Sequence, residues 1–370
     1  MKRSLLKKQE TLSGKTLMKE YFNFQNTCPL HLASIPAKQA KFCLSVFKTL
    51  QEKIPQLCDA LQNTTFLLAV SGGLDSLAML ALFAACQKHF GYRLQIAHYN
   101  HGIREESFAE EKLMEIICRR LRLPLTVERG DTPKFAENRK IGLEEAGRIL
   151  RYDFFEKQQE KNKNTILCTA HHANDLCEDV LMRLLRGTVW PRLGGMPYYD
   201  EKRRLLRPLL YVPKQRLADF LLPLDFPVAN DKTNADERFL RNRIRKTVIP
   251  LLEKENPQFY QNIIKLNQNA HYDSMHFQQQ VQEIFSYCEE TEQGFLLPLF
   301  TIQDKDKTIR MHTYHALLHK MGQGHAINAS FENLDHAVMR NQGKTVFKFS
   351  RSVRMQILHN VLYCFVKPNV

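Results

Sequence analysis

One short stretch constrains the fold of this chain more than any other. An apolar run over residues 66–70 leads directly into Ser71-Gly-Gly-Leu-Asp-Ser76. The run is short and ends at glycines, which predicts a buried strand. Residues 77–85 contain neither Gly nor Pro and are rich in Leu and Ala, which predicts a helix. A strand, a glycine turn and a helix in this order gather unpaired backbone N–H groups and the positive end of a helix dipole, so we expect a phosphate site.

The residues of this loop suit a nucleotide. Gly72 and Gly73 let the backbone approach closely, and Ser71 and Ser76 offer hydroxyl donors. Asp75 is the exception, because a carboxylate beside phosphates is repulsive unless a Mg²⁺ ion or a catalytic duty explains it. The loop lacks the Lys of a Walker motif and the spacing of a dinucleotide-binding motif. We therefore predict these nucleotide ligands, with Asp75 also catalytic and a Mg²⁺ ligand: Ser71, Gly72, Gly73, Leu74, Asp75 and Ser76.

The chain around the loop alternates strands and helices. Its periodicity predicts helices over residues 37–61, 106–121, 143–159 and 175–185, and further strands over 93–99, 125–127 and 165–169. Such alternation is typical of an α/β fold with a doubly wound parallel sheet, covered by helices on both faces. In these sheets the ligand binds beyond the carboxyl ends of the strands. The loop and the polar motifs that follow other strands should therefore share one site.

Two further motifs are expected near the nucleotide. The segment His98-Tyr-Asn-His-Gly-Ile-Arg104 follows the strand at 93–99, and its two histidines, glycine and arginine favour a nucleotide-contacting loop. On the next helix, Arg148 and Arg151 lie three residues apart and so share a face. With Tyr152 beside them, they favour contact with an anion or a base.

Four polar side chains follow the strand at 165–169 and could be read as metal ligands: His171, His172, Asp175 and Glu178. Asp175 and Glu178, however, fall in the first turn of the predicted helix, where the helix dipole favours acidic side chains. Neither a third His nor a Cys pair follows. A transition-metal site is therefore disfavoured, and Mg²⁺ held by Asp and nucleotide phosphates is preferred.

The charge of the chain points to a polyanionic partner. Its 370 residues suit two or three domains, and the net charge is +14. Nucleic acid is the first choice and an acidic membrane the second. The basic residues form two runs, which we interpret as a track for an RNA backbone: Lys202, Arg203, Arg204, Arg207, Lys214 and Arg216, then Arg238, Arg241, Arg243, Arg245 and Lys246.

Cysteine usage and hydropathy favour the cytoplasm. The nine cysteines include no C-x-x-C pair, which argues against a zinc ribbon and a disulfide framework. No apolar run is long enough to span a membrane, and the N-terminus lacks a signal-peptide core. The sequence does not fix the oligomeric state, and a homodimer is compatible with it.

The sequence predicts four segments: a flexible N-terminal extension at 1–36, a catalytic domain at 37–255, a helical linker at 256–290 and a C-terminal α+β domain at 291–370. The last should contain helices at 309–321 and 331–340 and an antiparallel meander with strands at 346–349, 353–358 and 361–366. His359 and Asn360 should form the turn between its last two strands.

Together these motifs resemble the tRNA(Ile)-lysidine synthetase family, whose loop is of the ATP pyrophosphatase type. The resemblance rests on the order and spacing of several motifs, strongest over residues 60–255: Ser71-Gly-Gly-Leu-Asp-Ser76, Asn100-His-Gly-Ile-Arg104, Arg148-Ile-Leu-Arg-Tyr152, Thr169-Ala-His-His172, Asp231-Lys-Thr-Asn234 and Arg241-Asn-Arg-Ile-Arg245. It implies an adenine nucleotide hydrolase-like catalytic domain and a C-terminal domain that helps to bind tRNA. We expect the chain to lack the third domain of longer family members.

The resemblance also implies a reaction. ATP and Mg²⁺ would serve to adenylate C2 of the wobble cytidine in tRNA(Ile) with a CAU anticodon, releasing pyrophosphate. Free L-lysine would then displace AMP to form lysidine, changing codon reading from AUG to AUA. The amine has an ordinary pKa near ~10.4, so a base or desolvation must free its lone pair. His101, His172 and Asp175 are all candidates for that base.

The predicted site residues complete this interpretation. The catalytic set is Asp75, His101, Arg148, His172 and Asp175. The tRNA-binding set is Arg151, Arg207, Arg241 and Arg245.

Three departures from the family pattern affect local geometry. Gly147 stands where Ala usually precedes the first Arg of its motif, Asp179 stands where Thr is usual, and Trp190-Pro-Arg192 interrupts a glycine-rich turn.

Two alternative functions stay open. One is tRNA thiolation on the same loop, for which Cys177 is the better-placed thiol because a helix dipole could lower its pKa, whereas Cys168 lies in a predicted core strand. The other is RNA binding without catalysis, against which the intact Ser71, Asp75 and Ser76 argue.

Overall fold

The computed structural model describes residues 30–102, 106–228, 239–322, 328–343, 345–350 and 352–366. Contacts divide the chain into two compact units, Met1–Val189 with Leu193–Asn267, and Trp190–Arg192 with Gln268–Val370. The boundary at Asn267 falls inside helix α13, Phe259–Phe285, which lies within the predicted linker. The domain limits predicted at 36, 255 and 290 stay predictions, and most of the predicted N-terminal extension lies outside the described residues.

A six-stranded sheet with the order β3-β2-β1-β4-β6-β5 organises the first unit. Its strands are β1 Thr65–Ala69, β2 Arg93–Asn100, β3 Leu125–Arg129, β4 Thr165–Cys168, β5 Tyr199–Asp200 and β6 Leu205–Leu206. The first four and β6 run parallel, whereas β5 pairs antiparallel with β6 at the edge. Leu67 in the central strand faces Gln95 of β2 and Leu167 of β4. The predicted doubly wound parallel sheet is confirmed, and the β5–β6 hairpin extends it.

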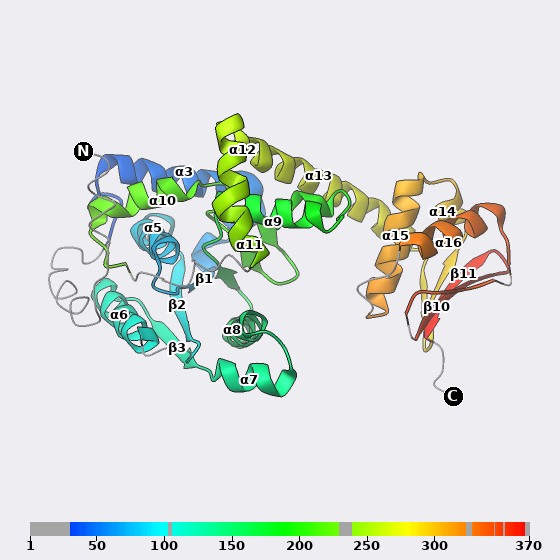
Figure 1. The fold of residues 1–370 in the computed structure, drawn as a ribbon, viewed down its shortest axis with the longest axis horizontal. Helices are drawn as coiled ribbons and strands as arrows, with labels where there is room; N and C mark the ends of the chain where they lie inside the picture. Colours follow the sequence, from blue (N-terminus) through cyan, green and yellow to red (C-terminus); the bar gives the residue numbers. More distant parts are fainter. Residues whose placement is uncertain are drawn as a thin grey trace. The chain divides into compact units, whose positions relative to one another are not determined.

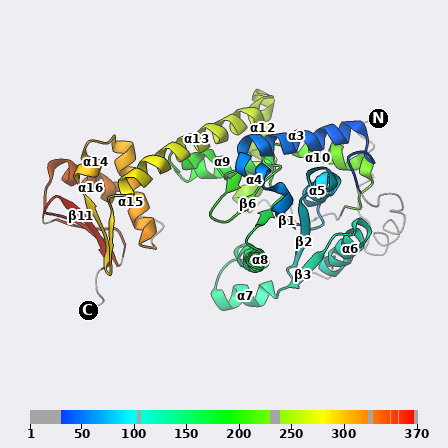
Figure 2. The same ribbon diagram turned by 180° about the vertical axis from the view of Figure 1, so that it is seen from behind.

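Helices cover both faces of this sheet (Figures 1 and 2). The helices of the first unit before α13 are α3 Ala37–Lys53, α4 Pro55–Asp59, α5 Leu74–Phe90, α6 Glu106–Leu121, α7 Thr132–Arg139, α8 Leu143–Glu160, α9 Ala173–Leu185, α10 Lys214–Leu221, α11 Leu240–Arg243 and α12 Ile249–Glu255. Strand residues alternate between the faces: Phe66 and Leu68 pack with α3 and α5, while Leu67 packs with Tyr152 and Phe154 of α8. This two-residue period explains why both faces are apolar.

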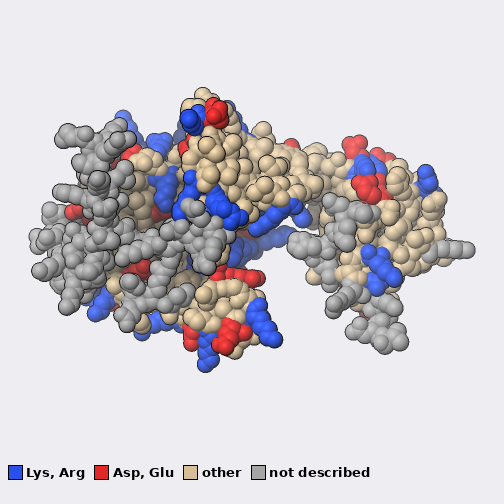
Figure 3. All heavy atoms as spheres, in the orientation of Figure 1, with Lys and Arg blue, Asp and Glu red and all other residues tan. Residues whose placement is uncertain are grey.

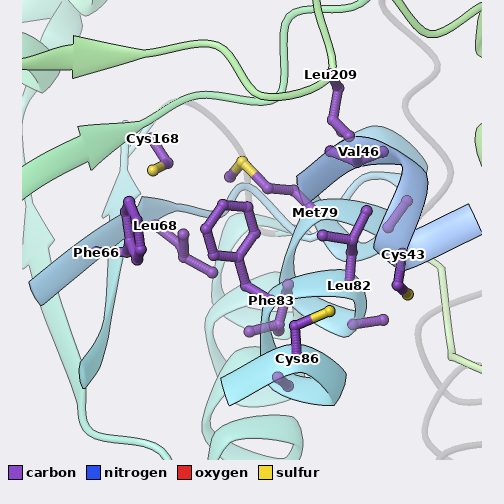
Figure 4. Packing of buried hydrophobic residues seen from close by; sticks show 14 of the residues in the cluster. Cys43, Val46, Phe66, Leu68, Met79, Leu82, Phe83, Cys86, Cys168 and Leu209 are labelled. Atoms are coloured by element: carbon purple, nitrogen blue, oxygen red, sulfur yellow. The ribbon is translucent and has the colours of Figure 1, made fainter. Parts of the chain in front are cut away.

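The larger core lies between α3, α5 and the sheet. Phe83 of α5 lies between Phe66 of β1 and Phe47 of α3, with ring centroids 5.1 and 5.4 Å away. Figure 4 shows Met79 and Phe83 directed from α5 into the space beside β1. Helix α5 is therefore fixed by its packing, and the Ser71–Ser76 loop leads into its first turn.

The single helix predicted over residues 37–61 is wrong. The helix α3 ends at Lys53, and a second helix, α4, begins at Pro55. Proline lacks an N–H and disfavours a helical conformation in the residue before it, and Ile54 lies outside the helical region, with φ −141° and ψ 69°. The break therefore follows from one residue within the predicted helix.

The second unit packs helices against an antiparallel sheet with the order β7-β8-β11-β10-β9. Its elements are β7 Glu289–Thr291, β8 Gly294–Pro298, α14 Phe300–Gln303, α15 Lys307–Lys320, α16 Asn328–Arg340, β9 Val346–Lys348, β10 Val353–Leu358 and β11 Val361–Val366. The predicted meander is confirmed as β9–β11, and β7 and β8 extend it. His359 and Asn360 have φ of 48° and 63°, the left-handed values of a tight hairpin turn.

A buried ion pair joins the two long helices of the second unit. Arg310 of α15 donates from Nε and Nη2 to the two carboxylate oxygens of Asp335 of α16, at 2.7 and 2.8 Å. Tyr314 donates its hydroxyl to Asp335 at 3.0 Å. The side chains of the pair are only 9% and 7% exposed, so each charge depends on the other.

We predict that Asp335→Asn lowers the free energy of unfolding of the second unit by about 3–5 kcal/mol, because it leaves Arg310 buried without its counter-charge. Burial alone raises the pKa of Asp335, but Arg310 and Tyr314 lower it overall. The contribution of Asp335 to the free energy of unfolding is therefore present above its ordinary pKa of 3.8. It is lost as the pH falls through the lower pKa that Asp335 has in the folded protein. Denaturant unfolding at several pH values measures both effects.

The matched control is Glu332→Gln, which removes the charged partner of Lys307 in an ion pair between the same two helices. The side chains of Glu332 and Lys307 are 49% and 56% exposed. That change should cost at most about 1 kcal/mol. Equal losses in the two variants would contradict the importance of the buried pair.

Candidate active site

The Ser71–Ser76 loop connects β1 to α5 and is held by its own serines. Gly72 has a φ of 90°, a left-handed value that a glycine adopts without strain. Ser76 donates its hydroxyl to the Gly73 carbonyl at 2.9 Å and accepts from the Ser71 backbone N–H at 3.2 Å. The two serine hydroxyls also lie 3.2 Å apart. These bonds fix the turn at the start of α5, where phosphate binding is predicted.

Among the described residues, only one carboxylate oxygen of Asp75 has a partner. Its Oδ2 accepts from Nζ of Lys214 at 3.2 Å and lies 3.4 Å from Nε2 of His172. Its Oδ1 is buried and has no hydrogen-bond partner among the described residues. Burial alone raises the pKa of Asp75, but His172 and Lys214 together lower it below its ordinary value. A charged carboxylate with a buried, unpartnered oxygen has the donor chemistry that fits Mg²⁺.

His172 connects Asp75 to the start of α9. Its backbone N–H donates to Oδ2 of Asp175 at 3.0 Å, and its Nδ1 accepts from the Asp175 backbone N–H at 3.4 Å. This reciprocal pair is a capping box. Because Nδ1 accepts a hydrogen bond, Nε2 is the ring nitrogen that can donate, and it faces Asp75. The histidine therefore caps a helix and orients the loop carboxylate at once.

Two arginines surround the acidic side chains of α9. The Glu178 side chain is only 1% exposed and accepts from Nε of Arg241 at 2.6 Å and from Nε and Nη2 of Arg245 at 2.5 and 3.0 Å. Nη2 of Arg241 also donates to Oδ1 of Asp175 at 3.3 Å. Arg241 lies in α11 and Arg245 in the π-helical turn η5, Ile244–Val248. The pairing raises the pKa of Arg245, and the two guanidinium groups compensate the buried carboxylate.

A cavity of about 300 Å³ opens beyond the carboxyl ends of β1, β2 and β4. The predicted site residues that line it are Ser71, Gly73, Asp75, Ser76, His101, Arg151 and Asp175. Those that do not line it are Gly72, Leu74, Arg148, His172, Arg207, Arg241 and Arg245. The strand ends thus bring together most of the predicted nucleotide and catalytic residues, as expected for a parallel sheet.

The imidazoles of His101 and His171 in the cavity wall are both held neutral. Burial, with the charge of Arg151, lowers the pKa of His101 to about 4. Burial also lowers the pKa of His171 to about 4, against the opposing charge of Asp175. Nδ1 of His171 lies 2.8 Å from the Thr169 hydroxyl. Both rings are uncharged near pH 7 and can donate or accept a hydrogen bond.

The departure at Gly147 fits the position of His101. A Cβ atom at residue 147 would lie 3.1 Å from both Cε1 and Nδ1 of the His101 ring, closer than most such contacts. The glycine of α8 therefore lets the imidazole rest against the helix backbone. Asp179, the second departure, accepts from Arg183 at 3.0 Å one turn along α9. Trp190 belongs to the third departure, the segment Trp190-Pro-Arg192. Its Nε1 donates to Asp273 at 2.8 Å within the second unit.

The site includes residues outside the predicted catalytic and binding sets. Among them, His98, His171 and Tyr152 line the cavity, and Lys214 binds Asp75. The sequence placed Lys214 in a basic run but gave no sign of its partner, which lies 139 residues away.

The predicted tRNA-binding arginines differ in exposure. Arg207 is only 7% exposed and donates from Nη1 to the Pro197 carbonyl at 2.7 Å. Arg241 and Arg245 keep 39% and 35% of their side chains exposed while they bind Glu178. Lys and Arg side chains gather over α11 and η5 on the face shown in Figure 3. The role of these arginines in tRNA binding stays a prediction, and Arg104, Asp231-Lys-Thr-Asn234 and Arg238 lie outside the described residues.

The prediction that a helix dipole lowers the pKa of Cys177 is wrong. Cys177 is fully buried, and burial together with the charge of Glu178 raises its pKa. Cys168 is also fully buried, as predicted for a core residue, and burial raises its pKa well above the ordinary value. Neither thiol is a ready nucleophile in this structure.

Two properties of the described residues bear on other classes of protein. They contain no group of three or more His, Cys, Asp or Glu side chains arranged to hold a metal ion. Among them there is also no helix with the length and apolar character that crossing a membrane requires.

Comparison with known proteins agrees with this geometry. Residues 46–252 match the model of the PP-loop domain family. A tRNA(Ile)-lysidine synthase from Nitratidesulfovibrio vulgaris is 34% identical over 81% of this chain and 93% of its own length. One from Enterococcus faecalis is 35% identical over 64% of this chain and 51% of its own length. The U34-tRNA thiolase NcsA from Methanococcus maripaludis shares the fold, with a TM-score of 0.50 over 61% of this chain and 79% of its own, at 16% identity.

The family match covers the strands of the first unit, the Ser71–Ser76 loop and the cavity residues, and the first of these relatives matches over nearly its whole length. The chain therefore belongs to the PP-loop domain family and, within it, to the tRNA(Ile)-lysidine synthase family.

Proposed function

We propose that this chain uses ATP to adenylate the wobble cytidine of tRNA(Ile) with a CAU anticodon and then joins free lysine to C2 of that base. The observation that carries the proposal is the placement of Asp75. Its free carboxylate oxygen faces no protein donor among the described residues, although it belongs to a phosphate-type loop at the edge of the cavity. Family membership and the basic charge of the chain support the choice of tRNA as the substrate.

The loop and Asp75 divide the binding of ATP between them. The N-terminus of α5 and the Ser71 and Ser76 hydroxyls suit the pyrophosphate part of the nucleotide. Asp75 would hold Mg²⁺ through Oδ1, and the ion supplies charge neutralisation for the departing pyrophosphate. Lys214, bound to the other oxygen, keeps the carboxylate oriented toward the cavity and adds positive charge beside the phosphates.

The proposed reaction has two displacements. The C2 oxygen of cytidine bonds to the α-phosphorus of ATP, and the bond to pyrophosphate breaks. The lysine ε-amine then bonds to C2, the bond to the oxygen carrying AMP breaks, and the amine loses a proton. Two of the three candidates for accepting that proton already have partners: His172 contacts Asp75, and Asp175 accepts a hydrogen bond from Arg241.

His101 is therefore our choice for the proton acceptor. It lines the cavity, and its Nδ1 faces the Thr132 hydroxyl at 3.4 Å. A pKa of about 4 makes this imidazole a weak base. It would accept the proton as the bond to C2 forms and acidifies the amine, and an anionic adenylate nearby would strengthen it as a base.

The proposal predicts a modified nucleoside of defined mass. Wild-type protein incubated with ATP, lysine and a CAU-anticodon tRNA(Ile) transcript should convert one cytidine to a lysine adduct, detected by mass spectrometry after nuclease digestion. Asp75→Asn should reduce pyrophosphate release by at least about a hundredfold, because it removes the charge opposite the phosphates. It should leave the fold and tRNA binding intact.

The matched control is Asp219→Asn, which makes the same change at an exposed position of α10 and should retain full activity. A sulfur-containing nucleoside in place of the lysine adduct would refute the lysine assignment in favour of thiolation. Wild-type turnover by Asp75→Asn would refute the role of Asp75.

The basic residues predict steep salt dependence of tRNA binding. Replacing Arg241 and Arg245 together with Gln should flatten the plot of log affinity against log salt by about one unit for each phosphate that the variant no longer neutralises. The variant should also be less stable, because Glu178 would stay buried without its partners. Filter binding at several salt concentrations and thermal unfolding separate the two effects.

Lys41→Gln with Lys48→Gln removes the same charge from exposed positions of α3 and should leave the slope unchanged. A folded Arg241 and Arg245 variant with the wild-type slope would show that these arginines serve the fold alone.

A further inference from the structure

Three guanidinium groups surround the ring of Tyr152. The Cζ atoms of Arg203, Arg148 and Arg151 lie 4.6, 4.9 and 5.9 Å from its centroid. Arg148 and Arg151 belong to α8 with the tyrosine, whereas Arg203 comes from the turn between β5 and β6. Two segments about fifty residues apart thus meet on one aromatic side chain.

Like charges do not gather in this way without compensation. The faces of an aromatic ring carry negative electrostatic potential and attract guanidinium groups within about 6 Å. Arg203 has one carboxylate contact, from its Nη2 to Glu156 at 3.4 Å, whereas Arg148 and Arg151 have no ion-pair partner among the described residues. Glu144 acts on Arg151 only at longer range. The cluster therefore keeps an excess of positive charge around the ring.

The ring and the turn are both fixed by their surroundings. Tyr152 is only 7% exposed and packs with Leu67 and Phe155 in the core on the α8 side of the sheet. Nε2 of Gln159, near the end of α8, donates to the Arg204 carbonyl at 3.2 Å. This bond holds the turn that carries Arg203 against the helix. The cluster is a built feature of the fold and not a chance meeting of long side chains.

The cluster extends from the cavity to the surface. Tyr152 and Arg151 line the cavity, whereas Arg148 and Arg203 do not and are exposed. A polyanion whose end enters the cavity would therefore meet Arg148 and Arg203 outside it. The phosphates of ATP have their own binding loop at Ser71–Ser76, so the second phosphate source, the RNA backbone, suits this position better.

We propose that Tyr152 is a positioning residue that gathers Arg148, Arg151 and Arg203 into a binding site for one backbone phosphate of the RNA substrate, next to the nucleotide that enters the cavity. This inference rests on the proposed function, since it takes tRNA as the substrate. The planar guanidinium groups can donate two parallel hydrogen bonds each to phosphate oxygens. The ring sets their positions and does not itself contact the phosphate.

The test compares Tyr152→Leu, which removes the aromatic ring, with Tyr152→Phe, which keeps it. The affinity for tRNA is measured at several salt concentrations. We expect Tyr152→Leu to flatten the log–log salt slope by about 0.7–0.9, the value for one phosphate that is no longer neutralised. Tyr152→Phe should keep the wild-type slope, because the ring faces are retained. Thermal unfolding confirms that each variant is folded.

A matched control is Phe135→Leu, which removes a ring that contacts an arginine elsewhere, on α7. There the Cζ atom of Arg139 lies 5.5 Å from the centroid of the Phe135 ring. It should not change the slope. If Tyr152→Leu does not fold, Arg203→Gln serves in its place, because the exposed Arg203 can be neutralised without opening the core. It should flatten the slope by the same amount.

The outcomes are distinct. A folded Tyr152→Leu variant, or Arg203→Gln, with the wild-type slope would overturn the inference, as would a Tyr152→Phe slope as flat as that of Tyr152→Leu. If both Tyr152→Leu and Arg203→Gln fold, their double variant should lose little more slope than either alone, because the three groups act on one phosphate. Wild-type protein that fails to bind tRNA would instead refute the proposed function, whatever the variants do.

Discussion

The site depends on a carboxylate that the described part of the chain contacts through only one of its oxygens. Asp75 lies in a loop suited to phosphates, and a carboxylate beside a phosphate repels it unless a cation lies between them. Lys214 and His172 both bind Oδ2, while Oδ1 is buried without a partner among the residues described. A buried polar atom without a partner costs free energy. That cost supports the proposal that a cation binds there together with the nucleotide.

The position of Asp75 depends in turn on a chain of contacts that ends at a buried acid. His172 binds Asp75 with its ring and Asp175 with its backbone, and Arg241 joins Asp175 to Glu178. Burying the Glu178 charge would be prohibitive without both arginines, so α9 and the segment of α11 and η5 must pack together. The arginines that suggested RNA binding from sequence thus also have a structural duty. Whether the remaining exposed part of each also contacts RNA is a separate matter that salt dependence decides.

Local patterns predicted most of the parallel sheet, because each strand and helix of the alternation carries its own periodicity and the loop glycines mark one turn. The carboxyl-end rule then placed Asp75, His101 and Asp175 at one cavity. Contacts between distant segments had no such signal: nothing near Lys214 points to Asp75, and nothing near Arg203 points to Tyr152. The error at Cys177 arose because α9 begins at Ala173, so that Cys177 lies beyond its first turn, and because burial raises the pKa of this thiol more than the dipole could lower it. The short helix α7 was not predicted although Asp131 and Pro133 mark its start. Asp131 caps the helix, since its Oδ1 accepts from the Lys134 backbone N–H at 3.1 Å.

The most direct test of this account is the Mg²⁺ dependence of nucleotide binding by the intact chain, measured by calorimetry with a non-hydrolysable ATP analogue and no tRNA. If Asp75 holds a cation between itself and the phosphates, the wild-type protein should bind the analogue at least about tenfold more tightly with Mg²⁺ than with EDTA, equivalent to about 1.4 kcal/mol. Asp75→Asn should lose most of that difference, because the neutral amide neither repels the phosphates nor attracts the ion. Equal affinities with Mg²⁺ and with EDTA in the wild-type protein would contradict the account.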